Sequence, residues 1–296
     1  MATIPGRFGA VLTAMVTPFD ANGTLDLDTA AHLARWLVDH GNDGLVVTGT
    51  TGEGPTLADN EDRELWRAVR EAVTVPIIAG AGTNDTRHSI EQVQAAEAAG
   101  VDGVLAVTPY YNRPSQAGIE AHFRATAAAT TLPVMLYDIP IRAGRKIAHD
   151  TLVRLLTEVP NIVAVKDAAL DVSASARLVA DAPDDFDLYS GNDDQTLPLL
   201  SIGAVGVVGV ATHWAGVQMG EMIAAFSKGD VDEARRLNQR MLESYDFEGS
   251  DLTPNPVPAK AMMRVLGIPV GECRLPNAPA PEGLEDRARD VLARLG

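Results

Sequence analysis

Short apolar runs rich in β-branched residues alternate with longer segments of helical period along most of the chain. Eight such runs occur, at Val11–Val16, Gly44–Thr48, Val75–Ala79, Gly103–Val107, Pro133–Tyr137, Ile162–Lys166, Asp187–Ser190 and Val205–Val210. Helix-like stretches lie between them, and three aspartates (Asp28, Asp59 and Asp171) stand where helix N-caps are expected. Strands that alternate with helices predict a parallel sheet, and strands that are apolar on both faces predict that helices cover it.

Eight strand-helix units in roughly 225 residues predict a (β/α)8 barrel, also called a TIM barrel, which typically needs about 250 residues. After the eighth run the pattern indicates helices only, near Val231–Ser244, Val257–Leu266 and Leu284–Leu295. We therefore expect residues 1–228 to form an α/β barrel that carries the active site. Residues 229–296 are expected to form a helical C-terminal extension packed on that barrel.

Composition and charge narrow the class of protein. The chain has 296 residues, of which 46% are hydrophobic and 22% charged, as in folded globular proteins. Its formal net charge of -16 is spread along the chain, which argues against nucleic acid as a partner. No apolar run approaches the ~18 residues of a membrane span, and Met1–Gly9 lacks a signal-like apolar segment. A soluble, cytoplasmic protein without a membrane partner is expected.

Cysteine and histidine usage gives no sign of a metal site. The single cysteine, Cys273, excludes an internal disulfide and any site made of several cysteines. The histidines do not have H-x-H or H-x-x-x-H spacing, and we expect no metal ligand set among them. His213 follows the eighth strand, where a structural role is favoured over a place in the site.

Polar residues gather where the predicted strands end, which is where barrel enzymes build their active sites. They are the turn 48–54 after strand two, Tyr110–Pro114 after strand four, Tyr137 on strand five, Lys166 on strand six and Ser190–Asp193 after strand seven. Three of the five tyrosines fall at these positions. We expect the functional groups to converge at this end of the barrel.

Lys166 is the most informative of these residues. Only four of the 24 Lys and Arg residues are lysines, and Lys166 alone lies within an apolar strand. Burial disfavours the ammonium form and can lower a lysine pKa by ~3–5 units, which yields a nucleophilic amine able to form a Schiff base with a carbonyl. The alternative is a structural ion pair with a nearby carboxylate. Asp167 is the neighbouring acid, but adjacent strand residues face opposite sides.

The other candidates have plausible roles and equally plausible structural alternatives. The phenol of Tyr137 could move protons near Lys166, or it could simply close the barrel mouth. Thr50 and Thr51 could hold a carboxylate in their glycine-rich turn, or they could stabilise an ordinary turn. Arg142 could bind a second carboxylate, or it could be solvated.

Taken together, Lys166, Tyr137, the turn 49–53 and the segment Tyr110–Ser115 closely resemble the dihydrodipicolinate synthase family. The resemblance runs nearly from end to end. It includes the segments Ala14–Phe19, Leu136–Pro140, Val165–Asp167, Ser190–Asp193 and Asn255–Pro258.

This resemblance implies a lyase that condenses pyruvate with L-aspartate 4-semialdehyde in diaminopimelate and lysine biosynthesis. Lys166 would form the Schiff base with pyruvate, and Tyr137 would donate and accept protons. Thr50 and Tyr111 would complete a proton relay, with Tyr111 contributed by the neighbouring subunit.

The resemblance also implies how the substrates are held. Thr51 and the backbone at Val208 would bind the pyruvate carboxylate, and Arg142 would bind the carboxylate of the aldehyde. A homo-oligomer is implied, commonly a tetramer of two tight dimers. No metal and no organic cofactor are expected, because the imine on Lys166 carries the chemistry.

Three alternatives remain open at this stage. N-acetylneuraminate lyase, 2-keto-3-deoxy-sugar-acid aldolases and 4-hydroxy-2-oxoglutarate aldolase share the barrel, the lysine and the tyrosine. A barrel that has lost catalysis and serves as a binding protein is a second alternative. A phosphate-handling isomerase is a third, but Ser190–Asp193 offers acid rather than cations where phosphate would bind.

Overall fold

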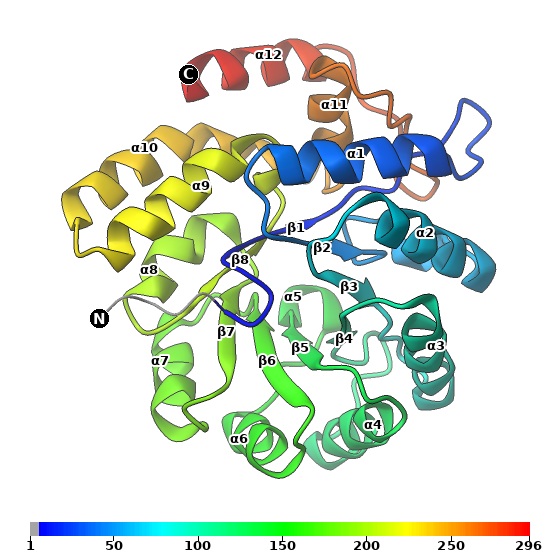
Figure 1. Cartoon of the computed structure of the whole chain (residues 1–296), viewed down its shortest axis with the longest axis vertical. Helices are drawn as coiled ribbons and strands as arrows, with labels where there is room; N and C mark the ends of the chain where they lie inside the picture. The colour runs from blue at the N-terminus through cyan, green and yellow to red at the C-terminus, as the bar shows by residue number, and fades with distance from the viewer. Residues whose placement is uncertain (1–5) are drawn as a thin grey trace.

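The computed structural model describes residues 6–296, so the first five residues of the segment Met1–Gly9 lie outside it. Eight parallel strands close into a barrel in chain order, as Figure 1 shows, which confirms the predicted fold class. The strands are β1 (Val11–Ala14), β2 (Gly44–Val47), β3 (Ile77–Gly80), β4 (Gly103–Val107), β5 (Val134–Asp138), β6 (Ile162–Asp167), β7 (Asp187–Ser190) and β8 (Gly206–Gly209).

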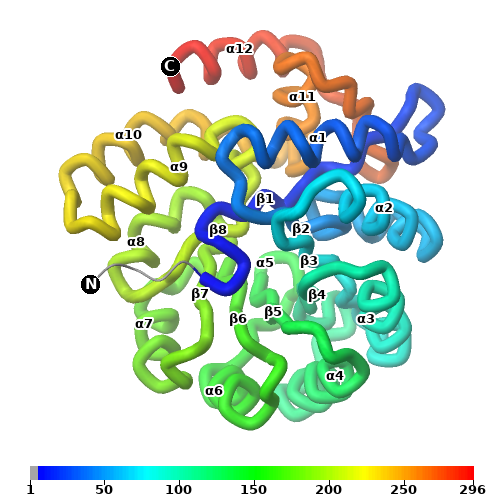
Figure 2. Tube along the Cα trace, in the orientation of Figure 1, coloured from blue at the N-terminus to red at the C-terminus, as the bar shows by residue number. Residues whose placement is uncertain are grey.

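Helices surround the barrel, and the chain continues beyond β8 as helices only (Figure 2). The helices between strands are α1 (Leu27–Asp39), α2 (Asp59–Ala72), α3 (Thr86–Ala99), α4 (Gln116–Ala128), α5 (Pro140–Ala143), α6 (His149–Glu158), α7 (Val172–Asp181) and α8 (Thr196–Leu200), with short 3-10 turns η1 (Gly54–Thr56) and η2 (Asp193–Gln195). Those after β8 are α9 (Thr212–Ser227), α10 (Val231–Phe247), α11 (Val257–Val265) and α12 (Leu284–Leu295). Helix α12 packs against α10 and α11, and lies at one edge of the molecule in Figure 1.

The strands are buried on both faces, which explains their nearly continuous apolar sequences. Successive strand residues face opposite sides. Leu12 and Val46 belong to the cluster that fills the barrel together with Tyr137 and Tyr189. Their neighbours Val11 and Val47 belong to the larger cluster between sheet and helices. Two apolar layers therefore hold the strand ends in fixed positions.

Of the three aspartates expected to be helix N-caps, one is an N-cap in the structure. Asp171 is the N-cap of α7, where its carboxylate accepts a hydrogen bond from the Ala174 N–H at 2.9 Å. The other two predictions were wrong. Asp26, two residues earlier than predicted, caps α1, and Asp59 is the first residue of α2 rather than its cap. Asp28 and Asp59 still lie in the first turns of their helices, where a negative charge interacts favourably with the helix dipole.

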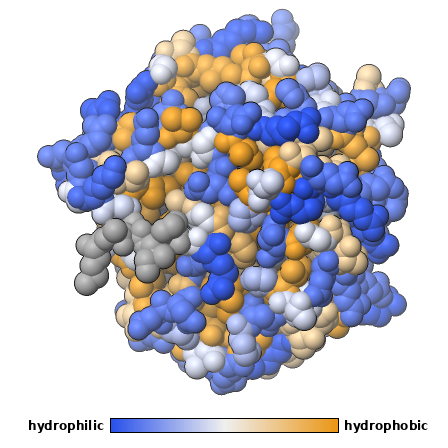
Figure 3. All heavy atoms as spheres, viewed as in Figure 1, coloured by the Kyte–Doolittle hydropathy of each residue, from blue (hydrophilic) through white to orange (hydrophobic). Residues whose placement is uncertain are grey.

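The face in Figure 3 carries hydrophilic residues around most of its rim, with apolar residues exposed between them. No helix within residues 6–296 combines the length and the apolar character needed to cross a bilayer. The same residues contain no cluster of three or more His, Cys, Asp and Glu side chains placed to hold a metal ion.

His213, on α9, joins the first and last strands of the barrel. Its Nε2 atom accepts a hydrogen bond from the Val16 N–H at 3.1 Å, and its Nδ1–H donates to the Val210 carbonyl at 2.8 Å. The side chain is fully buried. Burial lowers the pKa of His213 to about 4, partly offset by the hydrogen bond to Val210. The residue is therefore a neutral structural link, as favoured above.

The buried neutral state of His213 predicts a pH-dependent stability. Because its pKa falls from 6.5 to about 4 on folding, the unfolded chain binds more protons between these values, and stability falls as the pH drops through this window. Relative to pH 7, the loss at pH 5 should be about 2 kcal/mol smaller in His213→Gln than in the wild type. Denaturant titrations at both pH values measure this difference. His32→Gln, at an exposed histidine, is the control, and equal pH dependence in all three proteins would contradict the assignment.

Candidate active site

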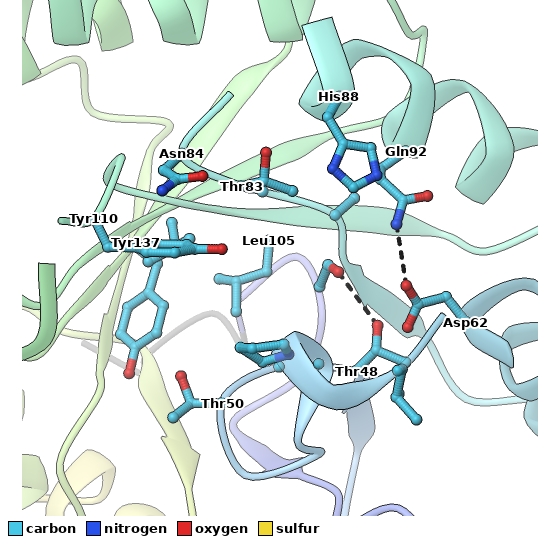
Figure 4. Close-up of a pocket in the computed structure, with 18 of the residues that line it drawn as sticks. Thr48, Thr50, Asp62, Thr83, Asn84, His88, Gln92, Leu105, Tyr110 and Tyr137 are labelled. Carbon is cyan, nitrogen blue, oxygen red and sulfur yellow. Dashed lines mark hydrogen bonds between the residues drawn. The ribbon is translucent and has the colours of Figure 1, made fainter. Parts of the chain in front are cut away.

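A pocket of about 420 Å³ opens between the C-terminal ends of the strands. Its walls come from the turn after β2, the loops after β3 and β4, the end of β5 and the short helix α5. The residues relevant to the chemistry are Thr50, Asp62, Asn84, His88, Gln92, Tyr110, Tyr137 and Arg142. Figure 4 shows Tyr137 and Thr50 at one end of the pocket, with Asp62, His88 and Gln92 at the other. Of the predicted site residues, Thr50, Tyr137 and Arg142 line this pocket.

Lys166 and Tyr137 are neighbours across the β5–β6 pairing. The strand register places the two residues directly opposite each other. The Lys166 Nζ atom lies 4.4 Å from the centroid of the Tyr137 ring. Both side chains are buried, and Lys166 is not among the residues that line the open pocket. The amine therefore lies beside the phenol ring and is shielded from bulk water.

Burial governs the protonation of Lys166. It lowers the pKa of Lys166 to about 8, although Asp193 and Glu248 act in the opposite direction and Arg142 adds to the lowering. At pH 7 the neutral fraction of such an amine is about 10%, against less than ~0.1% for an ordinary lysine. No carboxylate within residues 6–296 lies at ion-pair distance from Lys166. The structural ion pair considered above is therefore absent from the described chain.

Asp167 has a separate structural role on the opposite face of β6. Its carboxylate accepts hydrogen bonds from the Ala169 N–H at 2.8 Å and from the Ser175 hydroxyl on α7 at 2.5 Å. This orientation follows from the strand alternation and confirms that Asp167 does not pair with Lys166.

The Tyr137 hydroxyl faces Thr50. Figure 4 shows the two hydroxyl groups directed toward each other at one end of the pocket. Burial raises the pKa of Tyr137 to about 12, while the charge of Arg142 and the hydrogen bond from Thr50 lower it in part. A phenol that keeps its proton and has a hydroxyl partner is suited to exchanging protons with a neighbouring group.

Thr51 and Val208 occupy buried positions near these residues. Thr51 follows Thr50 in the turn and is almost completely buried. Its hydroxyl oxygen accepts a hydrogen bond from the Asn255 side chain at 2.9 Å. Val208 lies on β8 in the apolar cluster that also contains Tyr137. Neither residue lines the open pocket.

Arg142 and Tyr111 differ in their relation to the pocket. Arg142, on α5, lines it, is exposed, and has no acidic partner within residues 6–296. Its guanidinium is therefore available to an anionic ligand. Tyr111 is 90% exposed and does not line the pocket of its own chain. Its backbone has φ of 71°, an uncommon conformation for a tyrosine, which costs free energy and is often associated with function.

Two buried acids near Lys166 were not identified from the sequence as part of the site. Asp193, in η2, accepts a hydrogen bond from the Val210 N–H at 2.8 Å. Glu248, just after α10, forms a hydrogen bond with Asp193, and burial raises the pKa of Glu248 well above its usual range. A protonated Glu248 can thus donate to Asp193, which leaves one negative charge near Lys166. Asp193 stood within the predicted strand-end segment, but no local pattern connects Glu248 with it.

The far end of the pocket is acidic. Asp59 accepts a hydrogen bond from the His88 ring at 3.0 Å, and Asp62 accepts one from the Gln92 amide at 3.0 Å (Figure 4 shows the second). Burial raises the pKa of Asp62 to about 7, with smaller contributions from neighbouring groups. Tyr110 lies between this region and Tyr137 in the lining of the pocket.

The protonation of Lys166 predicts how any reaction of its amine with a keto acid would depend on pH. Because only a neutral amine adds to a carbonyl, the rate of imine formation at Lys166 should rise about tenfold per pH unit below pH 8 and level off above it. Asp193→Asn removes the anion that favours the ammonium form, so its midpoint should lie at a lower pH than that of the wild type. Rapid-quench borohydride trapping from pH 6 to 9.5 measures both profiles. Asp194→Asn, at the adjacent exposed acid, is the control and should keep the wild-type midpoint.

Comparison with known proteins agrees with this arrangement. The chain matches the dihydrodipicolinate synthetase family over residues 7–294. It is 55% identical to the 4-hydroxy-tetrahydrodipicolinate synthase of Acidothermus cellulolyticus, covering 99% of this chain and 94% of that protein. Its structure resembles the dihydrodipicolinate synthase of Bacillus anthracis (TM-score 0.93, 44% identity, 97% and 98% of the chains covered). It also resembles the lysine-bound enzyme of Cyanidioschyzon merolae (TM-score 0.95, 43% identity, 98% and 99% covered). The buried lysine, its tyrosine and the match over nearly the whole chain together show that this protein belongs to the dihydrodipicolinate synthase family.

Proposed function

We propose that this protein condenses pyruvate with L-aspartate 4-semialdehyde, the 4-hydroxy-tetrahydrodipicolinate synthase reaction of diaminopimelate and lysine biosynthesis. The single observation that carries the proposal is the shielded amine of Lys166 beside the ring of Tyr137. The named relative at 55% identity favours this reaction over the aldolases that share the same lysine and tyrosine. The groups that the chemistry needs are all present, which argues against a binding protein without catalysis.

The first step is imine formation at Lys166. The neutral amine adds to the C2 carbonyl of pyruvate, and the resulting carbinolamine loses its hydroxyl as water to give a protonated imine. Tyr137, whose ring lies beside the amine, supplies the proton that makes this hydroxyl a leaving group. Thr50, whose hydroxyl faces that of Tyr137, passes protons between the phenol and its surroundings.

The second step forms the carbon–carbon bond. The imine withdraws electrons, so the pyruvate methyl group loses a proton and becomes an enamine carbon. That carbon attacks the aldehyde carbon of aspartate semialdehyde, and the aldehyde oxygen takes up a proton. The amino group of the bound product then attacks the imine carbon, closes the ring and releases Lys166. Lys166 supplies the electron-withdrawing group itself, so the proposed reaction uses no metal and no organic cofactor.

Cationic and hydroxyl groups account for recognition of the two acids. Arg142 is exposed at the pocket without an acidic partner and is suited to the carboxylate of the aldehyde substrate. Thr51 and the backbone at Val208 are assigned to the pyruvate carboxylate. A small carboxylated aldehyde requires such a cation, which supports aspartate semialdehyde over a sugar acid.

The proposed assembly is a homotetramer built as two tight dimers, in the cytoplasm. Its support is Tyr111, which is exposed in an uncommon backbone conformation and absent from the pocket of its own chain. In the tight dimer Tyr111 enters the neighbouring subunit and completes the relay with Tyr137 and Thr50. Ile141, on α5, is 83% exposed, and burial in an interface would remove this apolar side chain from water.

The division of roles between Lys166 and Tyr137 is tested by trapping. Lys166→Ala should abolish the borohydride-reduced pyruvate adduct, because the nucleophile is gone. Tyr137→Phe should keep a detectable adduct on Lys166 while turnover falls roughly 10²- to 10⁴-fold, because only proton transfer is lost. Intact mass and peptide mapping measure the adduct, and a coupled assay with aspartate semialdehyde measures turnover.

Lys228→Ala, at an exposed lysine, is the control and should leave the adduct and the turnover unchanged. No adduct in the wild type, or an adduct on a lysine other than Lys166, would overturn the proposed function. A Tyr137→Phe variant that turns over as fast as the wild type would instead remove Tyr137 from the mechanism.

The origin of Tyr111 is tested by mixing two inactive variants. Tyr111→Phe and Lys166→Ala chains are unfolded together, refolded and assayed. If Tyr111 acts in the neighbouring subunit, half of randomly formed dimers are mixed and each has one complete site, so roughly a quarter of wild-type activity should return. If Tyr111 acts within its own chain, no mixed dimer has a complete site and activity stays absent.

A further inference from the structure

The turn that carries Thr50 and Thr51 is tied to the C-terminal segment of the chain. Glu53 Oε1 lies 2.7 Å from Lys260 Nζ on α11, and both side chains are almost completely buried. The other oxygen of Glu53 accepts a hydrogen bond from the Arg274 N–H at 2.8 Å. Glu53 has φ of 57°, so these two contacts hold it in a conformation that side chains rarely adopt. The end of the turn is thus fixed by residues more than two hundred positions away.

A second tie lies two residues earlier in the turn. Asn255, just before α11, donates a hydrogen bond from Nδ2 to the Thr51 hydroxyl oxygen at 2.9 Å. The Asn255 Oδ1 atom is buried and accepts no hydrogen bond in the described part of the chain. The Asn255 amide therefore meets the turn only as a donor.

This contact decides what the Thr51 hydroxyl can do. A threonine hydroxyl has one proton to donate and two lone pairs that accept. Asn255 occupies an acceptor site, and the hydrogen bonds within residues 6–296 include no acceptor for the Thr51 proton. The proton of this buried hydroxyl is therefore free for a ligand, and a carboxylate is the ligand that takes such a proton most strongly.

We propose that Asn255 is a positioning residue for pyruvate, which keeps the Thr51 hydroxyl in its donating state by supplying a hydrogen bond to its oxygen. The inference rests on the proposed function, in which Thr51 binds the pyruvate carboxylate. It adds that the C-terminal segment sets the direction of one hydrogen bond in the site, through Asn255, while Lys260 keeps the turn in register with that segment. Asn255 acts through Thr51 and does not touch the reacting atoms.

Asn255→Asp tests this directly, because it changes the group facing Thr51 from a donor to an acceptor with almost no change in shape. The Thr51 hydroxyl should then donate its hydrogen bond to the new carboxylate instead of to pyruvate. The KM for pyruvate in borohydride trapping should therefore rise about tenfold or more. The maximal trapping rate at saturating pyruvate should change by less than about threefold, which also shows that the variant is folded. Asn22→Asp, which adds the same charge at an exposed position, should leave KM unchanged.

Thr51→Val distinguishes action through Thr51 from direct repulsion of pyruvate by the new charge. If Asn255 acts through Thr51, Asn255→Asp should no longer raise the KM for pyruvate in the Thr51→Val background, because no hydroxyl remains there to donate a hydrogen bond. A penalty of equal size in both backgrounds, or an unchanged KM in Asn255→Asp, would overturn the inference and leave the proposed function standing. Absence of a pyruvate adduct in the wild type would overturn both.

Discussion

Exclusion of water from one primary amine is the condition on which the proposed chemistry of this protein depends. Lys166 has charged groups around it that act in both directions, since Arg142 disfavours the ammonium form and Asp193 favours it. Their contributions partly cancel, and burial remains the dominant cause of the lowered pKa. The packing of the barrel interior is therefore a cause of the reactivity of Lys166, because the packing that removes water also keeps part of the amine in its neutral, nucleophilic form.

Closure of the barrel places the other groups of the site around Lys166. The β5–β6 register brings Tyr137 beside Lys166, and the turn after β2 brings Thr50 to the Tyr137 hydroxyl. Side chains on closed parallel strands are held by apolar layers on both sides, so their relative positions vary little. The loops then add the groups whose positions tolerate more variation, such as Arg142 on the short helix α5.

The parts of this arrangement that could be predicted from sequence are those encoded locally. A lysine in an apolar strand and a tyrosine ending the preceding strand needed only strand alternation and the barrel rule for their placement. Helix caps were less predictable, because aspartate favours N-cap positions and both Asp26 and Asp28 were candidates, between which only backbone geometry selects. No local sequence pattern indicated Glu248, because its place in the site depends on packing against Asp193, which is far away in the sequence.

The C-terminal segment also bears on the order in which the protein is completed during synthesis. Phe19, in the loop after β1, lies between two cations, with Lys260 Nζ and the Arg274 guanidinium each 4.2 Å from its ring. The Lys260 ammonium and the backbone N–H of Arg274 also hold Glu53, and the Arg274 guanidinium pairs with Glu61 on α2 at 2.6 Å. A nascent chain that ends before Lys260 can contain every strand of the barrel and still lack the contacts that shape the turn after β2. The turn after β2 is therefore completed by contacts from residues that are synthesised more than two hundred positions later.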